Sequence, residues 1–101
     1  MKERFEAMLW VNNDPVELNA FVEEFLAKTV IGAASSLKGV KDIQSLELFL
    51  ERGNVKVIVN GKEVSLTPFP NDIIANTIIG LVSTLRGVGK VEVLKISVNV
   101  L

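Results

Sequence analysis

The sequence predicts a single α+β domain of two layers, in which two helices cover one face of a mostly antiparallel sheet. Three observations support this fold class. Apolar and polar residues alternate over several short stretches, which is typical of half-buried strands. Two longer apolar stretches have the spacing of amphipathic helices. The second half of the chain also repeats the pattern of the first half at a constant offset of 48 residues.

The repeat is clearest where residues 29–40, TVIGAASSLKGV, align with residues 77–88, TIIGLVSTLRGV. When residues 4–53 are aligned with 52–101 without a gap, 15 of the 50 positions are identical. Chance similarity of two apolar helices is the alternative, but the match continues into the flanking strands. Two copies are too few for a solenoid. We therefore expect one domain over residues 1–101, built from repeats at about 4–51 and 52–101 and related by a pseudo-two-fold.

Alternation predicts strands over residues 4–11, 43–51, 54–59, 62–66 and 90–100. A two-residue turn at Arg52-Gly53 would place all apolar residues of the second and third strands on one face. The turn at Asn60-Gly61 is a strong type I′ hairpin signal. The register that follows from these turns pairs Leu50 with Val55, Leu48 with Val57, Leu46 with Val59, and Val64 with Val57.

The first helix is predicted to run from Asp14, as its N-cap, to about Leu37, with Pro15 in the first turn and Gly39 after its end. The second is predicted from about Asn71 to Arg86.

The two repeats disagree at the start of the first helix. Residues 62–66 have a strand pattern, whereas their counterparts, Asp14–Leu18, have the pattern of a helix start. Either the first repeat also forms a short hairpin there, or the second repeat enters its helix differently. We favour the second alternative because Asp14-Pro15 is a strong local helix signal.

The predicted element order is β-α-β-β-(β)-α-β. Residues 37–48, LKGVKDIQSLEL, resemble the helix-to-strand junction of the ferredoxin-like plait, including its metallochaperone members. The resemblance implies a split βαβ architecture. The cysteine pair of the metallochaperones is absent, so the resemblance implies no metal site. A shared fold does not by itself imply a function.

The composition narrows the possible functions. The chain has no His, Cys or Tyr, so the usual general base, thiolate nucleophile and commonest metal ligand are missing. No carboxylate pair or phosphate-binding motif stands out, and we expect no enzyme, no cofactor and no metal. A net charge of −1 disfavours non-specific binding to nucleic acid or anionic membranes. Residues 1–6 lack the apolar segment of a signal peptide, and no apolar run could span a bilayer, so a cytoplasmic location is expected.

The helices offer one candidate interaction surface. A stripe through Leu26 and Ile74 is expected to face the sheet, and a small-residue flank at Gly32 and Gly80 is expected to let the helices approach closely. Each helix carries a second apolar stripe. It either widens the contact inside the monomer or forms an outward interface, and both interpretations stay open. Its residues are Ala27, Ile31, Ala34, Ala75, Ile79 and Val82.

The uncovered sheet face is the other candidate surface. Alternation places Met8, Trp10, Phe49 and Ile58 on it, among charged residues. We expect a non-catalytic interaction module that self-associates, as a homodimer, or binds an unidentified protein. The alternative is a small-ligand or nucleic-acid binder that uses the same face around Trp10. RNA-recognition modules stack bases on aromatic residues of central strands, but residues 54–59 carry no aromatic side chain, which disfavours nucleic acid.

Overall fold

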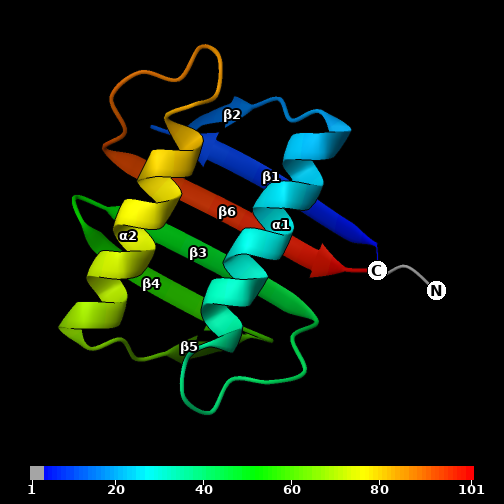
Figure 1. The fold of residues 1–101 in the computed structure, drawn as a ribbon, viewed down its shortest axis with the longest axis vertical. Helices are drawn as coiled ribbons and strands as arrows, with labels where there is room; N and C mark the ends of the chain where they lie inside the picture. The colour runs from blue at the N-terminus through cyan, green and yellow to red at the C-terminus, as the bar shows by residue number, and fades with distance from the viewer. Residues whose placement is uncertain (1–3) are drawn as a thin grey trace.

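The computed structural model describes residues 4–101 and shows a two-layer α+β fold with both helices on the same face of a sheet (Figure 1). The segment 1–3, part of the stretch judged not to be a signal peptide, lies outside the described residues. The elements in chain order are β1 (Phe5–Val11), β2 (Asp14–Val16), α1 (Ala20–Ser35), β3 (Ser45–Glu51), β4 (Asn54–Val59), β5 (Lys62–Val64), α2 (Pro68–Val82) and β6 (Val93–Val100).

The sheet has six strands in the order β2-β1-β6-β3-β4-β5, and every neighbouring pair is antiparallel. Each half of the chain therefore contributes the same succession, β-β-α-β. Strands β3 and β6 lie at the centre, where Leu48 pairs with Ile96. These two residues are separated by the same 48 positions that separate the sequence repeats, so the middle of the sheet joins equivalent positions of the two halves.

The predicted hairpin register is confirmed. Leu50 faces Val55, and Leu48 faces Val57, which also faces Val64 of β5. The turn residues Arg52 and Gly53 have φ values of 49° and 84°, and Asn60 and Gly61 have 50° and 83°. Two consecutive positive φ angles are what a type I′ turn requires, and its twist matches that of the flanking strands.

The prediction that Asp14–Leu18 begins the first helix is wrong. Residues 14–16 form the edge strand β2, because Asn12 and Asn13 adopt φ values of 51° and 71° and close a tight hairpin with β1. Asparagine tolerates this left-handed conformation better than most residues. Pro15 fits an edge strand, which has no further neighbour that needs its missing N–H. The sheet consequently has six strands rather than about five.

The boundaries of both helices differ from the predicted ones at each end. Helix α1 begins at Ala20, and its N-cap is Asn19, whose Oδ1 accepts a hydrogen bond from the Val22 N–H at 2.8 Å. It ends at Ser35 rather than Leu37. Helix α2 begins at Pro68 rather than Asn71, because proline suits the first helical position. It ends at Val82 rather than Arg86, where a tight turn replaces the last expected helical residues.

One hydrophobic core fills the space between the helices and the sheet. The helices contribute their sheet-facing side, and the four long strands contribute every second residue. Among the described residues, no polar or charged side chain is buried there. The core consists of Ala7, Leu9, Val11, Leu26, Ala27, Val30, Ala34, Leu46, Leu48, Leu50, Val57, Val59, Ile74, Ala75, Ile78, Val82, Leu94, Ile96 and Val98.

Candidate interaction surfaces

The sheet face opposite the helices, here called the open face, carries the four residues that the sequence placed on it. Met8 and Trp10 alternate with the buried Leu9 on β1, and Phe49 and Ile58 alternate with buried residues on β3 and β4. Met8 is 46% exposed, and the other three are half-buried among their neighbours. No element in residues 4–101 covers this face, since both helices cross the other one (Figure 1).

Lys95 joins the two aromatic residues of the open face. Strand β6 lies between β1 and β3, and Lys95 stands directly opposite both Trp10 and Phe49. Its Nζ lies 5.0 Å from the centroid of the Trp10 ring and 5.5 Å from that of Phe49. Each contact is a cation–π interaction, worth about 0.5–1 kcal/mol at an exposed site. The cluster therefore orders two aromatic rings on an uncovered surface.

The cross-strand registers arrange the open face in two parallel rows. The first, here the aromatic–lysine row, runs from β2 to β4 through Pro15, Trp10, Lys95, Phe49 and Lys56. The second, here the aliphatic–glutamate row, runs from β1 to β5 through Met8, Ser97, Glu47, Ile58 and Glu63.

Two ion pairs connect the rows. Lys95 Nζ lies 4.0 Å from Glu47 Oε2, and Lys56 Nζ lies 3.8 Å from Glu63 Oε1. All four side chains are substantially exposed, so water screens these pairs and each adds little to stability. The charges are nonetheless segregated, with two lysines in one row and two glutamates in the other.

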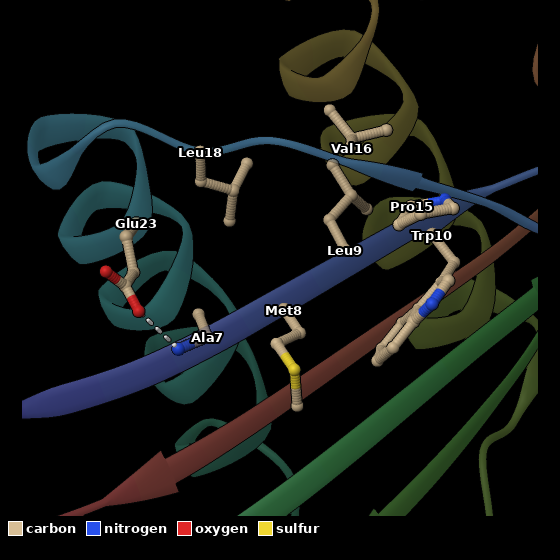
Figure 2. Close-up of a pocket in the computed structure, with 8 residues that line it drawn as sticks. All are labelled: Ala7, Met8, Leu9, Trp10, Pro15, Val16, Leu18 and Glu23. Atoms are coloured by element: carbon tan, nitrogen blue, oxygen red, sulfur yellow. Dashed lines mark hydrogen bonds between the residues drawn. The ribbon is translucent and has the colours of Figure 1, made fainter.

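A shallow pocket of about 220 Å³ lies where the open face meets the outer edge of β1. Figure 2 shows Met8 and Trp10 on β1, with Pro15 close to Trp10, and Glu23 reaching from α1 toward the backbone of Ala7. The Ala7 N–H donates a hydrogen bond of 2.9 Å to Glu23 Oε2. Because β2 pairs only with residues 9–11, this carboxylate satisfies an edge N–H that has no strand partner.

The second apolar stripe of the helices is largely part of the core, which favours the first of its two interpretations, a wider contact inside the monomer. Ala27, Ala34, Ala75 and Val82 are buried. Ile31 and Ile79 are half-buried and pack against the core. The reason lies in the helical wheel. The two stripes that the sequence suggested flank one broad apolar arc, whose centre is at Val30 and Ile78, which are 1% and 0% exposed.

The small residues of the helices do not mark a close helix–helix approach either. A Cβ added at Gly32 or at Gly80 would meet no atom within 4 Å, so both positions face open space. The expected packing of the two helices through these glycines is therefore wrong.

The outer side of the helices carries exposed apolar residues that the sequence reasoning missed. Phe21 and Phe69 are 74% and 72% exposed, and Phe25 and Ile73 lie one turn further along. The Phe21 and Phe25 ring centroids are 5.8 Å apart. Phe69 and Ile73 border a groove of about 270 Å³ with residues of the end of α1. A helical wheel could have identified these four residues as exposed, since they lie on the side of each helix opposite Val30 and Ile78.

In residues 4–101, no group of three or more His, Cys, Asp or Glu side chains is placed to hold a metal ion. Neither described helix is long and apolar enough to cross a membrane. No protein-family model matches the chain, and comparisons with curated proteins and with solved structures found no significant match.

Proposed function

We propose that this chain is a non-catalytic interaction module that self-associates as a homodimer through its open face. The observation that carries the proposal is the uncovered cluster of Trp10, Lys95 and Phe49, with Met8 and Ile58 beside it. Tryptophan and phenylalanine are enriched at the centres of protein interfaces, where a polar rim surrounds them. Of the charged residues of the two rows, Glu63 lies on the edge strand β5, whereas Lys95 and Glu47 lie on the central strands between the apolar residues. The expected compartment remains the cytoplasm.

The area of the open face is of the same order as the area that a dimer interface buries. Six strands spaced by about 4.8 Å, with long strands of about seven residues at about 3.3 Å each, give a face of roughly 500 Å² in projection. Side-chain relief raises the accessible area above the projected area. A standard interface buries about 800 Å² on each partner, so packing most of this face against a second copy supplies an area of the required order.

The open face also suits this role better than the helix layer. Exposed apolar residues of the helices fall into two separate pairs, Phe21 with Phe25 and Phe69 with Ile73, each at the start of its helix. The two helices run in opposite directions, so these pairs lie at opposite ends of the layer (Figure 1). The apolar residues of the open face instead lie on β1, β3 and β4 of one sheet face, where Lys95 of β6 lies between Trp10 and Phe49 and contacts both rings.

We further infer that the two halves arose by duplication and that the chain is a split-βαβ plait. The support is the shared element order and a shared set of hydrogen bonds at positions 48 residues apart. Strands β1 and β3 are parallel and have β6 between them, and β4 and β6 have β3 between them. The central strands are β3 and β6, which follow the helices, whereas the central strands of a ferredoxin-like plait precede the helices. The strand order therefore differs from the ferredoxin-like order expected from the sequence.

Sedimentation velocity over about two decades of protein concentration tests the proposal. The wild-type chain should be a dimer. Its dissociation constant should rise more than about tenfold in Trp10→Glu, because a charge buried in an interface must be desolvated. Phe21→Glu, which adds the same charge on the helix layer, is the matched control and should leave the dimer intact. Thermal unfolding should show that both variants remain folded. A wild-type monomer at every concentration, or dissociation by Phe21→Glu alone, would contradict the proposal.

Small-ligand or single-stranded nucleic-acid binding on the same face is the second candidate. The observation in its favour is the pair of aromatic rings beside a lysine, an arrangement that supports base stacking together with a phosphate contact. Titration with a single-stranded oligonucleotide would then quench Trp10 emission, and the quenching would weaken as salt is raised. Unchanged emission at low salt would exclude a nucleic acid that stacks on Trp10.

A further inference from the structure

We infer that Asn60 is a site of spontaneous deamidation that the folded β4–β5 hairpin protects. Asn60 is the only asparagine of the chain that is followed by glycine. The Gly61 nitrogen can attack the Asn60 Cγ because glycine has no side chain to hinder the approach. Asn12, the counterpart in the other half, is followed by Asn13, whose side chain does hinder it. Neither the chemistry nor the protection depends on self-association.

The modification requires no reagent except water. A bond forms between the Gly61 nitrogen and the Asn60 Cγ, the Cγ–Nδ2 bond breaks, and the Gly61 amide proton leaves with Nδ2 as ammonia. Water then opens the resulting five-membered cyclic imide at one of its two carbonyl carbons. Opening at Cγ gives aspartate. Opening at the main-chain carbonyl of residue 60 gives isoaspartate, in which the backbone runs through Cβ and Cγ.

The conformation of the turn opposes ring closure. The five-membered ring requires the Asn60 Cβ and the Gly61 nitrogen to lie on the same side of the Cα–C bond. The first central residue of a type I′ turn has a ψ of about 30°, and Asn60 and Gly61, with φ values of 50° and 83°, form such a turn. At that ψ the Gly61 nitrogen lies on the far side of the bond from Cβ, out of reach of Cγ.

The side-chain amide of Asn60 is also held in place. Its Oδ1 accepts hydrogen bonds from the Gln44 and Ser45 N–H groups at 2.8 and 3.0 Å, and its Nδ2 donates to the Asp42 carbonyl at 2.9 Å. These bonds must break before Cγ can turn toward Gly61. Because Asn60 is exposed, its conformation, and not access to water, limits the reaction. Deamidation therefore requires the hairpin to open locally.

Either product prevents the hairpin from closing as before. In the aspartate product an oxygen replaces Nδ2, so the bond to the Asp42 carbonyl is lost and a carboxylate faces that carbonyl. The isoaspartate product lengthens the main chain within the turn, and a longer turn does not keep the two-residue register that pairs Val59 with Lys62. A chain that is modified while unfolded is therefore impaired permanently, whereas a folded chain keeps Asn60 intact.

Peptide mapping by mass spectrometry tests the protection. The wild-type chain is incubated at mildly alkaline pH, either folded or unfolded in urea. In urea, Asn60 should deamidate faster than any other asparagine, and Gly61→Ala should suppress the reaction. In the folded chain the rate should be at least about tenfold lower, because the reaction follows the population of the open hairpin. Equal rates in the two states, or faster modification of another asparagine in urea, would overturn the inference.

Two equivalent variants locate the protection in this hairpin. Val64→Gly weakens β5, where Val64 pairs with Val57, and should raise the rate at Asn60 in the folded state several-fold. Val16→Gly weakens β2 at the position 48 residues earlier, where Val16 pairs with Leu9, and should leave that rate unchanged. Neither variant should change the rate in urea. Equal acceleration by both variants would contradict protection by the β4–β5 hairpin.

The effect of the aspartate product is measured separately. Asn60→Asp should unfold at a lower urea concentration than the wild type, because it loses the bond to the Asp42 carbonyl. Asn76→Asp adds the same charge at an exposed position of α2 and is the matched control. If Asn60→Asp unfolds at the wild-type urea concentration, conversion to aspartate does not impair the hairpin, and that part of the inference is wrong.

Discussion

The two halves of the chain agree in their backbone framework and differ on the open face. Asn12 and Asn60 occupy equivalent hairpin turns and make equivalent hydrogen bonds. Asn60 Oδ1 accepts from the Gln44 and Ser45 N–H groups at 2.8 and 3.0 Å, and its Nδ2 donates to the Asp42 carbonyl at 2.9 Å. Asn12 makes the same three bonds, with residues 92, 93 and 90, at 2.9, 3.0 and 2.8 Å. Each asparagine ties a hairpin to the loop that enters a central strand.

The open-face residues at equivalent positions have different chemistry. An offset of 48 residues relates Trp10 to Ile58, Glu47 to Lys95, Phe49 to Ser97 and Met8 to Lys56. The offset therefore maps the aromatic–lysine row onto the aliphatic–glutamate row. The asparagines that tie the hairpins are identical in the two halves, whereas these open-face residues differ. This difference creates the charge segregation between the two rows of the open face.

The largest effect is expected from removing either asparagine of the shared framework. Asn12→Ala and Asn60→Ala should each lower the free energy of unfolding by about 2–3 kcal/mol. Three hydrogen bonds are lost at about 0.5–1.5 kcal/mol each, partly replaced by water. Alanine also adopts the φ of about 50° at a cost of about 1 kcal/mol. Urea unfolding measures the loss, and the two variants should lose similar amounts if the halves are equivalent.

Glycine variants separate the two causes. Asn12→Gly and Asn60→Gly remove the hydrogen bonds but accept the positive φ, so they should be less destabilised than the alanine variants. Asn13→Gly is the matched control, since Asn13 has φ of 71° and no described side-chain hydrogen bond. A loss below about 0.5 kcal/mol in Asn60→Ala would contradict a structural role for these bonds.

A smaller loss of stability is expected toward the two outer edges of the sheet. There the two halves use different side chains to accept a hydrogen bond from a backbone N–H. Glu23 Oε2 accepts from Ala7, and at the equivalent place Asn71 Oδ1 accepts from the Val55 N–H at 2.8 Å. Asn71 Nδ2 also donates to the Gly53 carbonyl at 2.8 Å. Glu23→Ala should cost about 1 kcal/mol, and Asn71→Ala about 1–2 kcal/mol because it loses the bonds to Val55 and Gly53 and a longer one to Asp72.

The conservative variant at the first edge supplies the control. Glu23→Gln keeps an acceptor for the Ala7 N–H and should retain most of the stability that Glu23→Ala loses, as judged by urea unfolding at pH 7. If the glutamine and alanine variants unfold alike, the contribution of Glu23 is not this hydrogen bond.

The β3–β4 and β4–β5 hairpins were predictable because several local signals agree on one register. At the β3–β4 hairpin, the alternation of Leu48 and Leu50 with Val55 and Val57 and the turn at residues 52–53 all require the same pairing. The open-face position of Trp10 followed from the same alternation. These predictions depend only on residues close together in the sequence.

The features that were predicted wrongly or missed depend on competing local signals or on contacts with residues far away in the sequence. At Asp14 a helix-start signal competes with the turn at Asn12-Asn13, and pairing with β1 decides the outcome. The apolar arc of each helix is broad, so its centre at Val30 becomes clear only when the sheet is in place. Lys95 joins Trp10 and Phe49 because β6, the last strand, inserts between β1 and β3. No local pattern specifies that insertion.

The smallest expected effect concerns the helix N-caps, where the halves differ for an identifiable reason. Asn19 caps α1 through the Val22 N–H, but its counterpart, Thr67, makes no side-chain cap bond. The residue equivalent to Val22 is Pro70, which has no N–H to donate. Asn19→Ala should therefore cost about 1 kcal/mol, and Thr67→Ala only a few tenths.

In a Pro70→Val background the N–H is restored, and Thr67→Ala should then cost about 0.5–1 kcal/mol more than it does beside proline. A double-mutant cycle by urea unfolding measures this coupling, and a coupling near zero would show that Pro70 is not what prevents Thr67 from capping α2.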